Sequence, residues 1–175
     1  TYRVMGRDVI DLAVNDLRRI VAESVTEKLP AIGADGYFAL VQQSSQLSEL
    51  SGLSEATILH LLNRYGSLIS EILEIIESDK KLGQPISEEL PYLKAEVIYA
   101  VTHEGAQSVD DVISRRTRIA FEASDGGESL ASGIATLMAP TLDWDGAAKR
   151  ASVSEFTKQL KNERESLSKL LAKVR

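Results

Sequence analysis

The chain has 175 residues, of which 43% are hydrophobic and 26% charged, a composition typical of one globular domain and not of a disordered segment. Its formal net charge of -6 argues against a nucleic-acid-binding protein, because phosphate contacts require a basic surface. It has no cysteine, which excludes disulfides and thiolate metal sites. No apolar run approaches the roughly 20 residues that span a bilayer, so we expect a soluble or peripheral protein.

The first predicted helix begins at Tyr2 and runs to about Ser24. Apolar residues recur there at helical spacing, and polar residues fill the opposite face. The chain opens at Thr1, without a methionine, directly in the first turn of this helix, as is typical of an excised fragment. Residues 30–36 contain two glycines and are predicted to form a loop.

Three further helices are predicted between residues 37 and 82. The first is a less regular stretch over residues 37–47. Ser54 is a good N-cap for the second, and Gly66 is placed to end it in the left-handed conformation. The third follows at once, and its apolar stripe consists of Ile69, Ile72, Leu73 and Ile76.

The second half of the chain continues the helical pattern. One helix covers residues 93–101, the next begins at Ser108 and extends to Ala120, and a helix of small residues covers residues 130–138. Asp143 is expected to cap a last, long helix. No sustained apolar-polar alternation of strand type occurs. The predicted fold class is therefore all-α, a compact orthogonal helical bundle of about seven or eight helices.

Motifs that carry chemistry are missing from the sequence. It has no GxGxxG, GxxxxGK, GxSxG or HExxH, and His60 and His103 lie far apart without metal-ligand spacing. Each histidine is most simply a surface residue or a hydrogen-bonded core residue. The sequence thus predicts no catalytic residue and no metal site.

Two charged residues lie on apolar helix faces. At 100° per residue, Arg116 falls in the middle of its apolar stripe, and Glu104 falls among the apolar residues of the preceding helix. Because burying either charge alone is costly, we expect an antiparallel hairpin in which Arg116 pairs with Glu104 or with Glu96. One interpretation is a structural ion pair that fixes helix register. The other is that Arg116 binds a phosphorylated ligand, since guanidinium and phosphate match in a bidentate geometry.

The final segment, residues 156–175, is basic and amphipathic, with six Lys or Arg against two Asp or Glu. A solvated terminal helix is the simplest interpretation, and a partner surface or an anionic membrane surface is the alternative. The arginines at 115, 116 and 118 point in different directions, so we expect no nucleic-acid contact there. Trp144 is expected to anchor the start of the last helix in the core.

Several segments together resemble the C-terminal region of the FAD-dependent glycerol-3-phosphate dehydrogenase and glycerophosphate oxidase family. Residues 93–122, LKAEVIYAVTHEGAQSVDDVISRRTRIAFE, resemble the family's AEV-x-YAV segment followed by an acidic residue and an EDVL-x-RRTR helix. Further pieces are LNRYG at 62–66, LMAPTLDWD at 137–145 and TYRVMGRDVIDLAV at 1–14. The resemblance covers nearly the whole chain, although the basic tail extends beyond the part that matches.

The resemblance implies an activity for the full-length protein. It would oxidise sn-glycerol 3-phosphate to dihydroxyacetone phosphate, pass a hydride to FAD and return the electrons to quinone or oxygen. It would be cytoplasmic and peripheral on the inner face of the cell membrane. The dinucleotide fingerprint, flavin contacts and substrate arginines would lie mostly upstream, with Thr1 at the edge of the flavin site. We therefore expect the isolated chain to be inactive and to bind no FAD.

The resemblance also implies an organisation for residues 1–175 as a single helical C-terminal domain. Residues 1–25 would be a helix joining the missing flavin domain, 26–155 the core of a cap, and 156–175 an amphipathic terminal helix. The expected partner is the protein's own N-terminal FAD domain, and a homo-oligomer and a peripheral membrane contact stay open. The alternative is a free-standing helical interaction or regulatory module with no enzyme attached.

Overall fold

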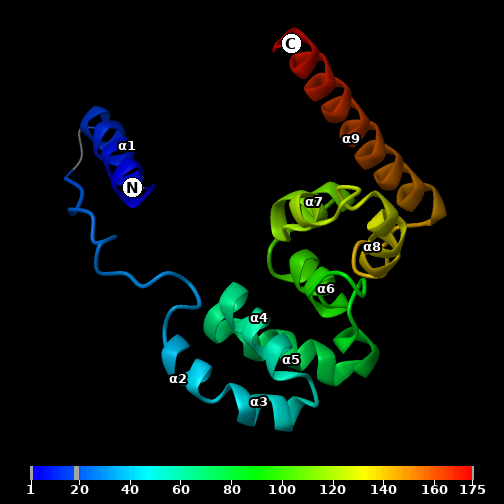
Figure 1. The fold of residues 1–175 in the computed structure, drawn as a ribbon. Helices are drawn as coiled ribbons and strands as arrows, with labels where there is room; N and C mark the ends of the chain where they lie inside the picture. The colour runs from blue at the N-terminus through cyan, green and yellow to red at the C-terminus, as the bar shows by residue number, and fades with distance from the viewer. Residues whose placement is uncertain (1, 18–19, 175) are drawn as a thin grey trace.

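The computed structural model describes residues 2–17 and 20–174. Within these ranges the chain is helical with no strand, and one isolated antiparallel bridge joins Pro85 to Leu93. The all-α prediction is confirmed. The described α-helices, shown in Figure 1, are α1 (Tyr2–Asp16), α2 (Tyr37–Gln42), α3 (Ser44–Ser51), α4 (Glu55–Tyr65), α5 (Ile69–Ser78), α6 (Lys94–Thr102), α7 (Ile119–Glu122), α8 (Ala131–Met138) and α9 (Gly146–Val174).

Helix α6 separates two clusters of buried apolar side chains, and it contributes residues to both. The first core cluster joins α6 to α4 and α5 and contains Ile58, Leu61, Leu62, Tyr65, Ile69, Ile72, Ile76, Leu93, Ala95 and Tyr99. The second joins α6 to α8 and the start of α9 and contains Tyr92, Val97, Ala100, Val101, Ala106, Val109, Val112, Ile113, Ile119, Ala131, Ile134, Ala135, Met138 and Phe156. Helix α6 therefore lies between α4 and the residues around Ile119. A side chain of α4 that contacts those residues must extend past α6.

Local sequence signals set several helix ends as predicted. The Ser54 side chain accepts a hydrogen bond from the backbone of Thr57 at the start of α4, and that of Ser108 accepts one from the backbone of Asp111. Gly66 ends α4 at φ 58 and ψ -132, so its φ is positive but its ψ lies outside the left-handed helical region. A Cβ at Gly66 would lie 1.9 Å from the carbonyl oxygen of Gly33, so the two backbones meet at a distance that only glycine permits.

Several predicted helix boundaries are wrong. Helix α1 ends at Asp16 instead of near Ser24, and none of its residues is buried, so no core contact extends the helix through the apolar residues that follow. The stretch that begins at residue 37 forms two helices that meet at Gln43, and the second of them extends beyond residue 47 to Ser51.

The helix expected over residues 108–120 is interrupted. Residues 111–116 wind as a π-helical turn, called η3 below, in which the backbone N–H of Thr117 donates to the carbonyl of Val112. The chain is extended at Thr117, and α7 then forms a separate short helix. The phase of the apolar stripe therefore changes between the two halves of the predicted helix.

The N-cap of α9 is Asp145 and not the predicted Asp143. The Asp145 carboxylate accepts hydrogen bonds from the backbone N–H groups of Ala147 and Ala148 at 2.9 and 2.7 Å. Asp143 has a positive φ of 52 and belongs to the turn before the helix. Trp144 is half-buried and packs against the second core cluster, as expected.

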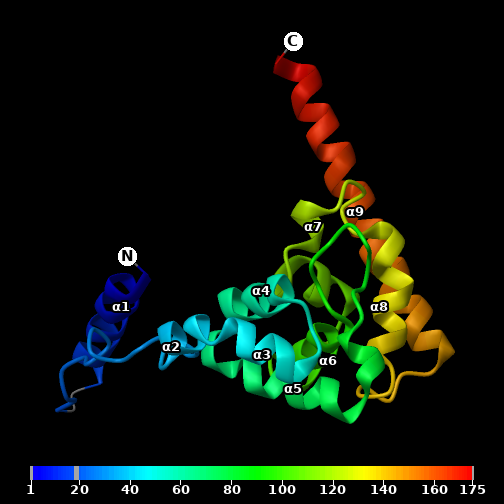
Figure 2. The ribbon, with the colours of Figure 1, turned by 60° about the horizontal axis from the view of Figure 1, so that its bottom comes forward.

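Both ends of the chain project from the helices that form the core (Figures 1 and 2). Helix α1 exposes large apolar side chains, among them Tyr2, Met5 and Leu12 at 67 to 72%. The C-terminal half of α9 exposes Leu167, Leu170 and Leu171 at 58 to 61%. None of the helices described is both long and apolar enough to cross a membrane.

Candidate functional site

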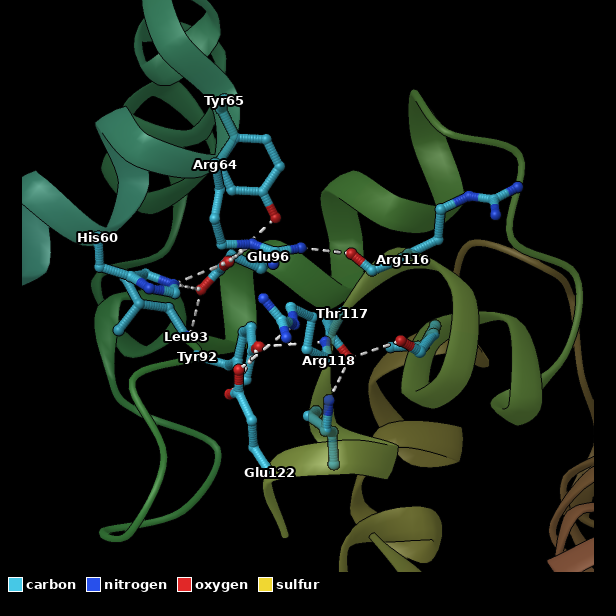
Figure 3. A network of polar contacts seen from close by, with 12 residues as sticks. His60, Arg64, Tyr65, Tyr92, Leu93, Glu96, Arg116, Thr117, Arg118 and Glu122 are labelled. Atoms are coloured by element: carbon cyan, nitrogen blue, oxygen red, sulfur yellow. Dashed lines mark hydrogen bonds and ion pairs between the residues drawn. The ribbon is translucent and has the colours of Figure 1, made fainter. Parts of the chain in front are cut away.

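The buried polar network of the protein is centred on Glu96, the one charged side chain in the described ranges that is fully buried. Figure 3 shows the groups around its carboxylate. The Tyr65 hydroxyl donates to Oε1 at 3.0 Å, and the backbone N–H of Leu93 donates to Oε2 at 2.7 Å. His60 Nε2 lies 3.2 Å from Oε1 and 3.1 Å from Oε2. The carboxylate therefore has partners from α4 and from the backbone that precedes α6.

Arg64 of α4 supplies the positive charge beside Glu96. Its Nε lies 3.3 Å from Glu96 Oε1, close enough for an ion pair but not aligned for a hydrogen bond. Its guanidinium carbon lies 5.5 Å from the centre of the Tyr65 ring and 5.1 Å from that of Tyr92, which are cation–π distances. Its Nη2 donates to the backbone carbonyl of Arg116. Arg64 thus joins α4, α6 and the end of η3.

The turn after η3 is fixed from several sides. The Thr117 hydroxyl donates to the carbonyl of Val112 at 2.6 Å, which closes the end of the π-helical turn. The backbone N–H of Arg118 donates to the Tyr92 hydroxyl at 3.0 Å, and that hydroxyl donates in turn to Glu122 Oε2 at 2.9 Å. The RRTR segment, residues 115–118, is therefore held through backbone groups and through its side chains.

The predicted partner of Arg116 is not the one in the structure. Arg116 is half-buried, and its Nε donates to the backbone carbonyl of Glu104 at 2.8 Å. Within the described residues it makes no ion pair with Glu104 or Glu96, and the basic partners of Glu96 are Arg64 and His60. Figure 3 shows the Arg116 side chain pointing away from Glu96 while its carbonyl faces Arg64. The π-helical turn explains this, because a 100° wheel no longer places side chains correctly beyond it.

The charges of the network alter the pKa values of its members. Burial raises the pKa of Glu104 and outweighs the opposing charges of Arg64 and Arg116, and its Oε2 is buried with no hydrogen-bond partner in the described residues. Burial and the charge of Glu96 raise the pKa of Tyr65 above its usual range, which keeps this hydroxyl a proton donor. Burial lowers the pKa of Arg64, but the interactions with Tyr65 and Glu96 raise it above its ordinary value.

The other residues singled out in the sequence lie outside the network or at its edge. His103 stacks on Tyr99 at 4.5 Å and lies 3.9 Å from Glu71, so the two histidines are in different surroundings. Arg115 pairs with Asp110 and Asp111 on the surface of η3. The expectation that Thr1 borders a flavin falls outside the described residues.

Sequence reasoning missed Arg64 and Tyr92, which connect most parts of the network. On the helical wheel of α4, Arg64 lies beside the apolar stripe and not within it. The apolar periodicity therefore does not predict that Arg64 is buried. The sequence contained one signal for the role of Glu96. A capping box has a Glu three residues after the N-cap, and Glu96 lies three residues after Leu93, the N-cap of α6.

The network connects backbone segments through hydrogen bonds and an ion pair. Two acids near the centre lie beside a base: Glu96 beside Arg64, and Glu122 beside Arg118, whose Nε lies 3.7 Å from it. Among the described residues, no three His, Asp or Glu side chains come together as a metal site. Chemically, the network can fix the α4–α6–η3 junction and orient the side chains of residues 116–118.

A family model described as the C-terminal domain of alpha-glycerophosphate oxidase matches residues 24–149. The chain belongs to this family. The matched range contains every residue of the Glu96 network, whereas α1 and the C-terminal half of α9 lie outside it. No solved structure matches the chain.

The chain is similar to several glycerol-3-phosphate dehydrogenases. It is 44% identical over 163 residues to glycerol-3-phosphate dehydrogenase 2 of Mycobacterium tuberculosis (strain ATCC 25618 / H37Rv), an alignment that covers 93% of this chain and 28% of the relative. It is 32% identical to glycerol-3-phosphate dehydrogenase of Synechocystis sp., over 82% of this chain and 26% of the relative. It is also 32% identical to the mitochondrial glycerol-3-phosphate dehydrogenase of Mesocricetus auratus, over 97% of this chain and 23% of the relative. The chain thus spans less than a third of the length of these relatives.

Proposed function

We propose that the chain is the C-terminal helical domain of an FAD-dependent glycerol-3-phosphate dehydrogenase. The full-length protein oxidises sn-glycerol 3-phosphate to dihydroxyacetone phosphate and passes the electrons to FAD and then to quinone or oxygen. The observation that carries the proposal is the alignment of 93% of the chain, at 44% identity, with a relative of that name. The chain itself is a structural domain and supplies no catalytic residue.

The described residues do not fit a flavin site on their own. A dinucleotide is usually held by a strand, a glycine-rich turn and the N-terminus of a helix. Residues 2–17 and 20–174 contain no strand, and the sequence has no GxGxxG. We therefore assign FAD binding to the part of the protein that precedes this chain.

Helix α1 is the proposed connection to that preceding part. Its apolar side chains are exposed although they recur at helical spacing, so the face has the pattern of a buried helix without a partner. Fully burying one such side chain contributes roughly 1.5–3 kcal/mol. Burial of several of these side chains against the preceding part of the protein would dock α1 there. The expected partner is the FAD domain of the same polypeptide.

The test is an activity assay on the full-length protein encoded by the gene. We expect flavin absorbance and reduction of a quinone or of oxygen that depends on sn-glycerol 3-phosphate. The 175-residue chain alone should show neither. A gene whose reading frame starts at Thr1, or a full-length protein without this activity, supports the alternative of a free-standing helical module.

We also propose that the protein is peripheral on the cytoplasmic face of a membrane, through the C-terminal half of α9. Leu167, Leu170 and Leu171 are exposed there, and Lys169 is also exposed. Replacing the three leucines by serine should reduce the fraction of full-length protein that floats with vesicles containing phosphatidylglycerol. Unchanged flotation would contradict this assignment.

A further inference from the structure

A pocket with a volume of about 390 Å³ lies between α8 and the first part of α9. The two helices run side by side in Figure 2, and they line the pocket with residues at helical spacing. Those residues are 132, 135 and 136 on α8 and 146, 149, 150, 153 and 154 on α9. The volume lies within the roughly 300–1,000 Å³ that is usual for small-molecule sites. Two packed helix faces thus form a space large enough for a small organic ligand.

The floor of this pocket is apolar and belongs to the core. Ala135 is buried, and the half-buried Val153 packs against the second core cluster. A Cβ on Gly146 would lie 3.2 Å from Nη1 of Arg150, so the guanidinium of Arg150 lies close to the first turn of α9. The absence of longer side chains at residues 135 and 146 leaves the space between the helices open.

Two cations line the pocket without a carboxylate partner. Lys149 is half-buried and Arg150 is exposed, and neither side chain forms an ion pair or a hydrogen bond with another residue that the structure describes. The acid at the start of α9, Asp145, instead accepts backbone N–H groups of the first helical turn. Lys149 and Arg150 therefore have charge and hydrogen-bond donors available for a ligand.

The other polar side chains of the lining carry hydroxyls. Those of Ser132 and Ser154 have no hydrogen-bond partner within the described ranges, and the Thr136 hydroxyl donates to the carbonyl of Ser132 at 2.9 Å. No Asp or Glu is among the lining residues. A guanidinium binds two phosphate oxygens at once, and an ammonium adds a point charge. Because a phosphate group offers three acceptor oxygens and a carboxylate two, this set of donors favours phosphate.

We propose that the pocket between α8 and α9 binds a small phosphate ester. The phosphate lies between Lys149 and Arg150, and the organic part lies on Ala135 and Val153. All of these residues belong to this chain, so the site does not rest on the proposed function. A soluble phosphate ester and the headgroup of a phospholipid share this chemistry.

Calorimetric titration of glycerol 2-phosphate into the 175-residue chain tests the charge requirement, since both core clusters form within this chain. Lys149→Gln/Arg150→Gln should weaken binding by roughly tenfold or more, because charge-assisted hydrogen bonds are the strong class. The matched control, Lys158→Gln/Lys161→Gln, removes the same charge from exposed positions of the same helix and should bind like the parent. Equal losses in the two double variants overturn the proposal.

A bulky substitution tests the pocket itself. Ser132→Trp fills the space without changing the charge, and Ser132 is exposed, so the fold should persist, which thermal unfolding checks. Ser168→Trp, at an exposed position of α9 outside the pocket, is the control. We expect only Ser132→Trp to lose the ligand. Undiminished binding in this variant overturns the proposal, because the two cations would then act without the pocket.

Vesicles separate the two sources of the phosphate group. Sedimentation with phosphatidylcholine vesicles, with and without phosphatidylglycerol, compares the parent with Lys149→Gln/Arg150→Gln. Binding of glycerol 2-phosphate assigns a soluble ester. Sedimentation that needs both phosphatidylglycerol and the two cations, without binding of glycerol 2-phosphate, assigns a lipid headgroup. The absence of both overturns the proposal and leaves the proposed function unchanged, since the full-length double variant should still oxidise sn-glycerol 3-phosphate.

Discussion

Arg64 joins three elements of the polar network, α4, α6 and the end of η3. Its guanidinium lies beside the Glu96 carboxylate, over two tyrosine rings, and against the carbonyl of Arg116. Its removal would leave a fully buried carboxylate without its permanently charged partner, the case in which a buried ion pair matters most. By contrast, Arg116 makes one hydrogen bond, to a backbone carbonyl.

We therefore predict a difference between two matched substitutions. Arg64→Met should lower the free energy of unfolding by roughly 2–4 kcal/mol, and Arg116→Met by only about 1 kcal/mol, because a lost bond from a charged donor costs less than an unpaired buried acid. Urea denaturation of the 175-residue chain measures both. A larger loss for Arg116→Met would contradict the network as described.

Glu104 predicts a pH dependence, since burial raises its pKa above the ordinary value of 4.5. The folded state then binds more protons than the unfolded state above pH 4.5, so this group destabilises the fold as the pH rises through that window. Glu104→Gln should be more stable than the parent at pH 7, and the difference should disappear as the pH falls to about 4. Thermal unfolding across this pH range is the measurement, with the exposed Glu88→Gln as control.

At the scale of elements, α4, α5, α6 and α8 agree with the helices predicted from the sequence, whereas the helix predicted over residues 108–120 is interrupted. Ser54 and Ser108 could be recognised as caps because their side chains act within three residues. The change at Thr117 could not, because π-helical turns are rare and a wheel of 100° per residue assumes a continuous α-helix. The burial of Glu96 depends on α4, which is distant in sequence.

The start of α9 provides the prediction for this scale. Asp145→Ala should cost about 1 kcal/mol of stability, because it removes the acceptor for two backbone N–H groups. Asp143→Asn should be neutral, since asparagine tolerates the positive φ at this position. Calorimetric unfolding of the two variants checks this, and the reverse order of effects would show that Asp143 is the cap.

For the whole molecule, the composition and the helical periodicity were enough to predict an all-α domain, and several segments together, RRTR among them, were enough to predict its family. The expected pairing of Arg116 was wrong because it required a continuous helix through residue 117. The predicted end of α1 was also wrong. An amphipathic sequence forms a helix over its full length only where another surface buries the apolar face, and no residue of α1 is buried.

A truncation series tests how far the folded core extends along α9. Arg164 still contacts Glu128 at 3.0 Å, whereas residues 165–172 are exposed. Ending the chain after Arg164 should leave the unfolding temperature nearly unchanged. Ending it before Phe156, which is 3% exposed, should cause a large loss. A large loss from the first truncation would mean that the outer leucines support the fold.

The contact between Gly33 and Gly66 has a mechanical consequence. The backbone N–H of Ser67 donates to the carbonyl of Gly33 at 2.9 Å. This hydrogen bond attaches the segment between α1 and α2 to the end of α4. The backbone at Gly33 is therefore held against the core. We therefore expect any reorientation of α1, and of a domain attached to α1, to come from backbone dihedral rotations between α1 and Gly33.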